Sequence, residues 1–349
     1  MKPARTAIIL LVMGASALAA AQTGAPASPA MPTPAPYTAE TTYAKLVKKY
    51  PFIRIASREV PASVRAVENI TYVRRGAHAL QMDLYLPAGP AGAPLPTRLP
   101  AKLPAIVLVH GGGWQSGVRA NFAPMAIRMA ERGFAAATVS YRLAPEARYP
   151  AAIHDVKAAL RWVRAHAGEY GIDPERIAVG GGSAGGQIAS LAGVTNGIDS
   201  FDPDGAQGAA SSAVSSAAQA IVNIDGLSDF TSKAARENED NPAKQPTAAG
   251  AWFGGSYAQE TALWHEASPT FHVGPKTPPV LFIGSAQARF SVGREEMVEK
   301  LKAQGVATQT VLLPDTPHSF WLMDPWLDPT VEATVAFLRA HMGPSARPR

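Results

Sequence analysis

The chain has 349 residues, of which 47% are hydrophobic, so it can form one large α/β domain or two small ones and is not globally disordered. It contains no cysteine, which excludes disulfides, thiolate metal sites and a cysteine nucleophile. The formal net charge is +5, but no stretch is dense in lysine and arginine, and the sequence gives no support for a nucleic-acid partner.

The N-terminus has the pattern of an export signal. Residues 1–5 are short and basic, Thr6–Ala20 is apolar and rich in small residues, and Ala19-Ala20-Ala21 fits a cleavage site before Gln22. The apolar run is short for a membrane span, so an uncleaved anchor is the less favoured alternative. We therefore expect a protein that works in the periplasm or outside the cell, without stable membrane insertion after cleavage.

Composition also predicts the domain organisation. We expect a signal peptide over residues 1–21 and a disordered Ala/Pro linker over residues 22–36, because that stretch cannot bury a core. A single domain is expected over residues 37–349, since no linker interrupts its pattern.

Short apolar runs rich in β-branched residues predict buried strands along the rest of the chain. These runs are Ile70–Val73, Leu80–Leu86, Ile106–Val109, Ala135–Tyr141, Ile177–Val179, Ile221–Ile224, Val280–Ile283 and Thr308–Leu313. Amphipathic segments between the later runs predict helices over Pro150–His166, Arg294–Gln304 and from Asp328 onward. This alternation predicts an α/β fold with a mostly parallel sheet of about eight strands, covered by helices on both faces.

Ligands of such sheets bind at the carboxyl ends of the strands, so the residues that follow each strand are the first candidates. Gly180–Gly186 follows Ile177–Val179 and contains the pattern G-x-S-x-G, with Ser183 at its centre and a potential helix after it. This context is typical of a nucleophile elbow, which presents the serine hydroxyl at a helix N-terminus. A glycine-rich loop that merely turns is the alternative.

A second glycine-rich segment, His110–Trp114, follows the third predicted strand. Successive glycines let backbone N–H groups converge on one oxygen, as the oxyanion of acyl transfer requires. We expect Gly112 and Gly113 to be donors, with Ala184 as a third, and His110 to be structural. The spacing matches neither a dinucleotide-binding nor a Walker loop, and no cofactor is indicated.

A histidine follows another of the predicted strands. His318 follows Thr308–Leu313, and an imidazole with a near-neutral pKa can take the serine proton and return it to a leaving alcohol. The other histidines fall in turns, on a surface helix, in a loop region or near the C-terminus, and are weaker candidates for a general base.

Together these residues resemble the α/β-hydrolase superfamily, and within it the hormone-sensitive-lipase-like and feruloyl-esterase-like serine esterases. The likeness runs from about Ile70 to Met342 and is carried by His110–Trp114, Ser140–Glu146, Gly181–Gly185 and His318–Phe320. It implies an α/β-hydrolase fold and a serine esterase without a cofactor. In such families Tyr141–Glu146 and Asp155 belong to the scaffold.

The chain departs from the family pattern at the acid of the catalytic triad. In many relatives this acid follows the strand equivalent to Val280–Ile283, in a Gly-x-x-Asp turn, but here the fourth position is Gln287. A glutamine can orient an imidazole through a hydrogen bond, but it cannot supply the negative charge that stabilises an imidazolium. The acid must come from elsewhere or be absent.

Asp225 is the leading candidate for this acid, because it directly follows Ile221–Ile224 and so lies at a neighbouring strand end. Asp229 and Glu237 are close alternatives. Asp315 is nearer to His318 in sequence but is expected to point away. An Asp-Gly turn at Asp225 with no role in the chemistry remains the plainest alternative.

The C-terminal part resembles a subset of the family associated with polysaccharide esters. On this likeness we expect Trp114, Arg289 and Trp321 to contact substrate, with Arg289 meeting a uronate carboxylate by a two-pronged contact. The alternatives are that Trp321 packs in the core or at the rim, and that Arg289 pairs with a nearby glutamate.

The sequence therefore predicts a secreted or periplasmic serine esterase that cleaves acyl or methyl esters on plant cell-wall polysaccharides through an acyl-enzyme on Ser183. One alternative is a general short-chain carboxylesterase or lipase. Another is a binding protein on a hydrolase scaffold, for which Gln287 is the only support. No metal site is expected, and the sequence gives no indication of the oligomeric state or of which ester is cleaved.

Overall fold

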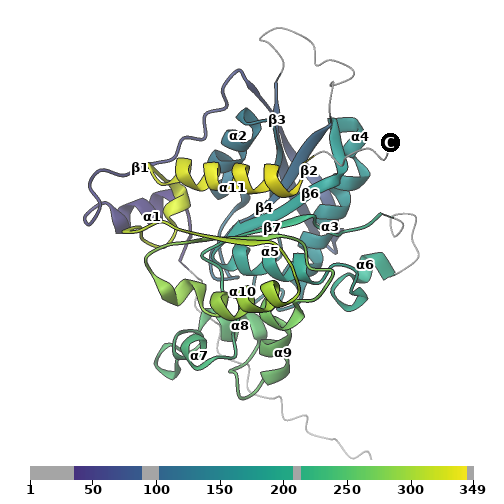
Figure 1. Cartoon of the computed structure of the whole chain (residues 1–349). Helices are drawn as coiled ribbons and strands as arrows, with labels where there is room; N and C mark the ends of the chain where they lie inside the picture. The colour runs from purple at the N-terminus through teal and green to yellow at the C-terminus, as the bar shows by residue number, and fades with distance from the viewer. Residues whose placement is uncertain (1–34, 89–101, 207–213, 344–349) are drawn as a thin grey trace, which may run out of the picture. The chain divides into compact units, whose positions relative to one another are not determined.

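A computed structural model describes residues 35–88, 102–206 and 214–343 (Figure 1). The expected signal peptide, and the expected linker up to residue 34, lie outside the described residues. The centre is an eight-stranded sheet with the order β2-β3-β5-β4-β6-β7-β8-β9. Its strands are β2 (Val64–Arg75), β3 (His78–Pro87), β4 (Leu103–Val109), β5 (Ala135–Val139), β6 (Ile172–Gly182), β7 (Ala220–Ile224), β8 (Val280–Gly284) and β9 (Thr308–Leu312).

The sheet is mostly parallel, as predicted. β3 pairs antiparallel with both β2 and β5, and every other neighbouring pair is parallel. β5, β7 and β8 are buried along their whole length, because helices cover both faces, and this explains why they are almost entirely apolar, with Thr138 and Asn223 as buried polar exceptions. β9 lies at the edge and is largely polar and partly exposed.

Helices cover the two faces in separate groups (Figure 1). One group consists of α3 (Ala151–Ala165), α5 (Ala184–Val194) and α10 (Arg294–Ala303), which pack on one face of the sheet. The other group, α2 (Ala123–Glu131) and α11 (Leu327–His341), packs on the opposite face. The predicted helices at the positions of α3, α10 and α11 are therefore confirmed, with boundaries shifted by one or two residues.

An insertion between β7 and β8 covers the carboxyl end of the sheet. It contains three short helices, α7 (Lys233–Glu239), α8 (Ala248–Phe253) and α9 (Thr261–Glu266). Buried aromatic rings hold it in place. Trp252 of α8 stacks on Trp114 of the body at a centroid distance of 5.0 Å, and within the insertion Phe253 of α8 packs against Trp264 of α9 at 4.7 Å. The sequence reading of the region around His265 as loop is thus wrong, because the helices are too short to show periodicity.

The remaining elements are small. They are α1 (Ala39–Leu46), β1 (Arg54–Ile55), α4 (Ala167–Tyr170), α6 (Pro203–Ala206), β10 (Met323–Asp324) and the 3-10 helices η1 (Arg119–Phe122), η2 (Asp199–Phe201), η4 (Pro242–Lys244), η5 (Pro269–His272), η6 (Ala288–Ser291) and η7 (Phe320–Leu322). β1 pairs antiparallel with β10, which ties the start of the described chain to the segment that follows His318.

A buried carboxylate holds the loop after β5. Asp155 of α3 is fully buried and accepts hydrogen bonds from the backbone N–H and the guanidinium of Arg142 and from Nε of Arg75. This cluster is part of the scaffold that the family resemblance implied.

We expect Asp155→Ala to lower the free energy of unfolding by about 3 kcal/mol, because it leaves the largely buried Arg142 without its carboxylate and removes one of the two carboxylates that pair with Arg75. Urea denaturation measures the change. Glu332→Gln, which removes an exposed ion pair with Arg132, is the control and should cost less than about 1 kcal/mol. Equal small losses in both variants would contradict the structural role given to Asp155.

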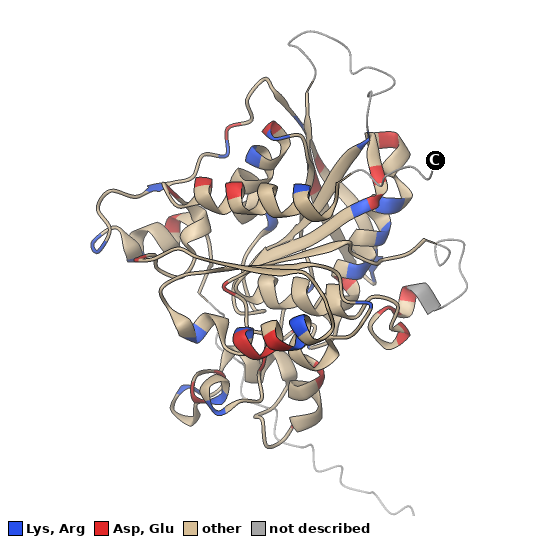
Figure 2. Cartoon of the chain, viewed as in Figure 1, with Lys and Arg blue, Asp and Glu red and all other residues tan. Residues whose placement is uncertain are grey.

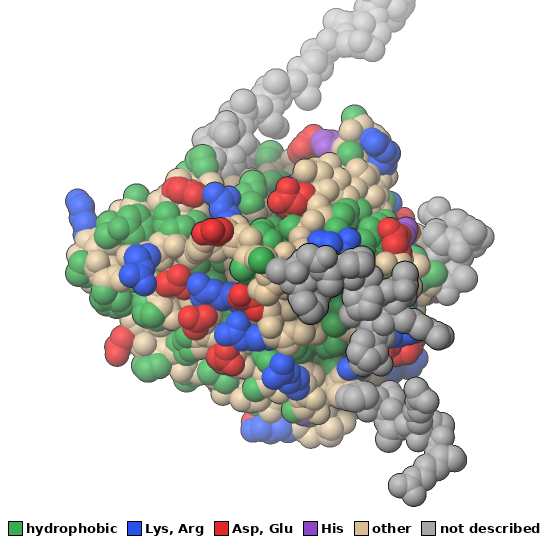
Figure 3. Space-filling model, turned by 90° about the horizontal axis from the view of Figure 1, so that it is seen from above, with side chains coloured by type: hydrophobic (Ala, Val, Ile, Leu, Met, Phe, Trp, Pro, Cys, Tyr) green, Lys and Arg blue, Asp and Glu red, His purple; other side chains and the backbone are tan. Residues whose placement is uncertain are grey.

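Basic and acidic residues are spread along the described chain (Figure 2), and on the face seen in Figure 3 their side chains are interspersed. Within the described part of the chain, no helix is both long and apolar enough to span a bilayer.

Candidate active site

Ser183 stands at the junction between β6 and α5, in the strand–turn–helix context that the sequence predicted. Its φ of 57° and ψ of −126° are strained for a residue with a side chain, and its N–H donates to the carbonyl of Ile224 on the neighbouring strand. The turn is possible because Gly185 has no side chain: a Cβ there would lie 2.1 Å from the carbonyl oxygen of Val109. The strain places the hydroxyl at the carboxyl edge of the sheet.

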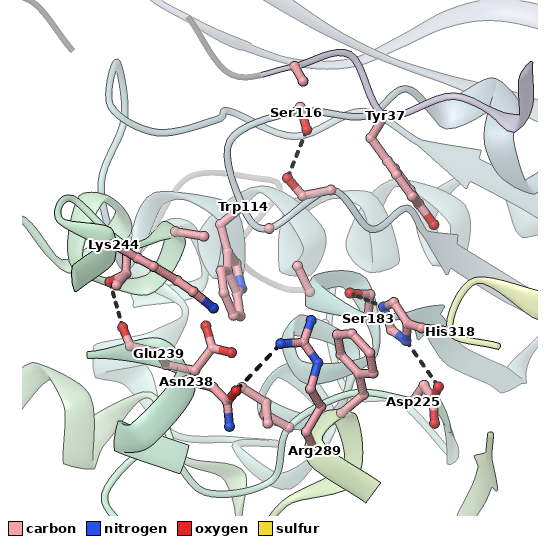
Figure 4. Close-up of a pocket in the computed structure, with 18 of the residues that line it drawn as sticks. Tyr37, Trp114, Ser116, Ser183, Asp225, Asn238, Glu239, Lys244, Arg289 and His318 are labelled. Atoms are coloured by element: carbon pink, nitrogen blue, oxygen red, sulfur yellow. Dashed lines mark hydrogen bonds and ion pairs between the residues drawn. The ribbon is translucent and has the colours of Figure 1, made fainter. Parts of the chain in front are cut away.

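Three side chains from three strand ends form one hydrogen-bonded chain (Figure 4). The Ser183 hydroxyl lies 2.9 Å from Nε2 of His318, and Nδ1 of the same ring lies 3.0 Å from Oδ2 of Asp225. A carboxylate only accepts hydrogen bonds, so Nδ1 carries the proton and Nε2 is free to accept from the serine. The contact between residues 183 and 318 that the esterase reading requires is therefore present.

Asp225 is held for this task by the backbone of the next strand. Its side chain is fully buried, and Oδ1 accepts the N–H of Ser285 at 2.8 Å while its own N–H donates to Ile283. Burial lowers the pKa of His318 below its usual value, although Asp225 acts in the opposite direction. The imidazole is consequently neutral, and able to accept a proton, at neutral pH.

The other candidate acids, and the glutamine at the usual position of the acid, lie elsewhere. Gln287 and Asp315 are exposed, Asp229 accepts hydrogen bonds from the turn that follows it, and Glu237 pairs with a lysine of its own helix. No hydrogen bond from any of these four to the imidazole is found among the described residues, so only Asp225 is brought to His318.

The glycine segment after β4 faces the same place. Gly112, with φ 126°, and Gly113, with φ 59°, line the pocket beside Ser183. A Cβ on Gly112 would lie 2.1 Å from the carbonyl of Ser116, so only glycine fits. No described residue accepts a hydrogen bond from either N–H, and Ala184, as the first residue of α5, has no intrahelical partner. Three amides are thus available for an oxyanion.

His110 lies beneath this segment and is buried. Its ring stacks on Tyr141 at 4.4 Å, and Nδ1 lies 2.8 Å from the carbonyl oxygen of Gly111. Burial lowers its pKa to about 4. These contacts fit the structural role expected for His110.

The two tryptophans that were expected to contact substrate are both buried, and only one of them lines the pocket. Trp114 is in the pocket wall but only 4% exposed, with its indole N–H donating to Gln187. Trp321 is 1% exposed and does not line the pocket; it packs edge-on against His318, in the space that Gly182 leaves by lacking a side chain. The expectation that Trp321 contacts substrate is therefore wrong.

Arg289 does reach the pocket. The pocket has a volume of about 500 Å³ and opens beside Ser183. Arg289 lines it together with Phe290, whose ring stacks on the imidazole of His318, and no carboxylate of the described chain pairs with it. The nearby Glu295 pairs with Arg294 instead, so the alternative that Arg289 pairs with a nearby glutamate is not found for this residue.

Several lining residues were not predicted. Tyr37 donates its hydroxyl to Ser319 at 2.8 Å, and Lys45, Glu239 and Lys244 also line the pocket. For Glu239 and Lys244 the signal is the length of the segment between β7 and β8, which is far more than one crossover helix needs. Tyr37 and Lys45 precede the sheet and carry no signal. Among the described residues, no group of three or more histidine and acidic side chains could hold a metal ion.

A mostly parallel sheet of this topology, with a serine elbow after β6, an acid after β7 and a histidine after β9, defines an α/β-hydrolase. The chain belongs to the BD-FAE family, whose sequence model matches residues 82–291.

Curated relatives are named as esterases. The chain is 32% identical over 247 residues to the esterase LipC of Mycobacterium tuberculosis, an alignment that covers 67% of this chain and 58% of LipC. It is 51% identical over 90 residues to the carboxylesterase NlhH of the same organism, covering 26% of this chain and 28% of NlhH. Over its longer alignments the chain spans about half the length of the curated relatives it matches.

Solved structures share the fold. Esterase 2 of Thermogutta terrifontis superposes with a TM-score of 0.62 at 24% identity, over 82% of this chain and 96% of that one. A bifunctional GH43-CE protein of Bacteroides eggerthii superposes with a TM-score of 0.64 at 25% identity, over 82% of this chain and 39% of its own.

Proposed function

We propose that the protein hydrolyses carboxylic esters through an acyl-enzyme on Ser183. His318 takes the hydroxyl proton as the serine oxygen attacks the ester carbonyl, and the resulting imidazolium is stabilised by Asp225. The N–H groups of Gly112, Gly113 and Ala184 bind the oxyanion. His318 then gives the proton to the leaving alcohol, and a water molecule, deprotonated by the same imidazole, releases the acid.

The hydrogen-bonded chain from Ser183 through His318 to Asp225 carries this proposal. The names of the curated relatives as esterases support it. A fluorophosphonate probe tests it directly, because it forms a covalent bond only with an activated serine. We expect one label per chain, on Ser183, and hydrolysis of short-chain model esters. A folded protein that neither labels nor hydrolyses would instead be a binding protein on this scaffold.

The pH dependence follows from the pKa of His318. Protonated His318 cannot accept the serine proton, so kcat/KM falls as the pH drops through this pKa. Because burial lowers the pKa below 6.5, we expect the acid limb of a kcat/KM profile to have its midpoint below pH 6.5 and the rate to be flat near neutrality. Initial rates between pH 4 and 8 on a neutral ester measure it. A midpoint above 6.5 would contradict the dominance of burial.

For the substrate, we propose acyl or methyl esters on plant cell-wall polysaccharides. The open pocket of about 500 Å³ and the likeness to a bifunctional GH43-CE protein support this. Release of acetate, methanol or ferulate from defined polysaccharides tests it, beside a chain-length series of simple esters. Turnover confined to the simple series would indicate a general short-chain carboxylesterase.

We also propose that the protein works outside the cytoplasm, on the pattern of residues 1–21. Fractionation and N-terminal sequencing of the protein from its host test this, and an intact Met1 on cytoplasmic protein would overturn it.

A further inference from the structure

The pocket beside Ser183 holds more cations than ester hydrolysis uses. Lys45 of α1, Lys244 of η4 and Arg289 of η6 all line it, against Glu239 and the buried Asp225 as the described acidic lining residues. None of these three cations takes part in proton transfer or in binding the oxyanion. Because they come from three separate elements and meet in one pocket, we expect them to bind an anionic group of a ligand.

These cations have no acidic partner in the described chain. None of the three has a carboxylate within the 4.0 Å of an ion pair. The polar contact found for the Arg289 guanidinium is a long one, 3.5 Å from Nη1 to Oδ1 of Asn238. A guanidinium has five N–H donors, so most of those on Arg289 are open to a ligand.

Arg289 is exposed, but its guanidinium packs beside the reacting groups. The Phe290 ring lies 3.4 Å from the His318 ring, with 10° between their planes, and the guanidinium carbon lies 4.1 Å from the centre of the same phenyl ring. No atom fits between two rings stacked at 3.4 Å, so the guanidinium must occupy the outer face of Phe290. This stack fixes a positive charge one ring away from the imidazole and reduces the entropy lost on binding.

Glu239 lies in the same part of the pocket, facing Lys244 and Arg289 (Figure 4). Its carboxylate is half-buried and has no hydrogen-bond donor among the described side chains. Burial raises its pKa, while Arg289 and Lys244 lower it. Glu239 and Asp225 balance two of the three lining cations, so the pocket keeps a net positive charge at neutral pH.

We propose that the site selects esters whose molecules also carry a carboxylate, which binds between Arg289 and Lys244. This selection rests on the proposed ester hydrolysis. The carboxylate can belong to the alcohol part, as in a uronic acid, or to the acyl part, as in the half-ester of a dicarboxylic acid. The chemistry at the cations is the same in both, so the test must separate the two sources.

Two matched substrate pairs make this separation. The first pair is methyl glucuronoside and methyl glucoside, each carrying an acetyl ester at the same position. The alcohol part of the first has a carboxylate where the second has a hydroxymethyl group. The 4-nitrophenyl monoester of glutaric acid and 4-nitrophenyl pentanoate differ in a carboxylate on the acyl part. We expect kcat/KM to favour the acidic member of one pair by about tenfold or more at low salt, and the preference to shrink several-fold at about 1 M salt.

Variants assign the preference to its residues. Arg289→Met and Lys244→Met should each cut the ratio of acidic to neutral kcat/KM several-fold, mainly through KM, and Glu239→Gln should raise it. Lys276→Met is the matched control, because it removes one exposed positive charge outside the pocket lining and should leave the ratio unchanged.

The outcomes separate the two proposals. Turnover of all four esters without preference in either pair, or a preference that Arg289→Met and Lys244→Met leave intact, overturns the selection while ester hydrolysis stands. If none of the four esters is cleaved, the proposed function itself is overturned, and the selection with it.

Discussion

Replacing Ser183 with alanine is expected to lower kcat on a short-chain ester by a factor of about 10⁴ or more. The variant loses the only atom that can form the acyl-enzyme, while His318 and the three amides keep their places. The backbone conformation at this position is equally strained for serine and alanine, so the fold should be retained. Rates at saturating substrate, with thermal denaturation as a check of folding, measure the effect.

The fluorophosphonate probe supplies the control for this experiment. The wild-type protein should carry the label on Ser183, and Ser183→Ala should carry none. If Ser183→Ala keeps near-normal hydrolysis, another group performs the attack and the proposed mechanism is wrong.

Asp225→Asn is expected to lower kcat by about 10⁴, with a much smaller change in KM. Asparagine fits the same buried space and can still accept the N–H of Ser285. However, it has no negative charge to stabilise the imidazolium, and its amide N–H favours the tautomer of His318 that cannot accept the serine proton.

Asp229→Asn and Glu237→Gln are the matched controls, because each removes one nearby carboxylate that does not contact His318. Both should stay within a few-fold of the wild type. A loss of only a few-fold in Asp225→Asn would show that its contact with the imidazole is not needed for catalysis.

Most of the fold could be predicted because its strands are buried on both faces. For this reason Ile106–Val109 and Val280–Ile283 are wholly apolar and Ile221–Ile224 is apolar except at Asn223, and each falls within a strand of the structure. The short helices α7 to α9 could not be predicted, because their stability comes from aromatic packing between distant residues such as Trp114 and Trp252.

The same contrast holds for the site. Ser183, His318 and Asp225 all follow strands. The rule that sites form at the carboxyl ends of strands is therefore enough to predict that they lie together. Trp321 was misplaced because its position depends on the space left by Gly182, which only tertiary packing reveals. Lys244 and Glu239 come from a segment without periodicity, and no local pattern points them at the serine.

The position of Asp225 has a consequence for divergence within such proteins. With the acid on β7, the segment after β8 supplies no acid to the reacting groups; it contributes the backbone N–H of Ser285 and the ring of Phe290. The side chains at Gln287 and Arg289 are therefore open to substitution without loss of the acid. A lineage built this way can exchange one substrate for another through mutations in a single short turn, while its chemistry is inherited intact.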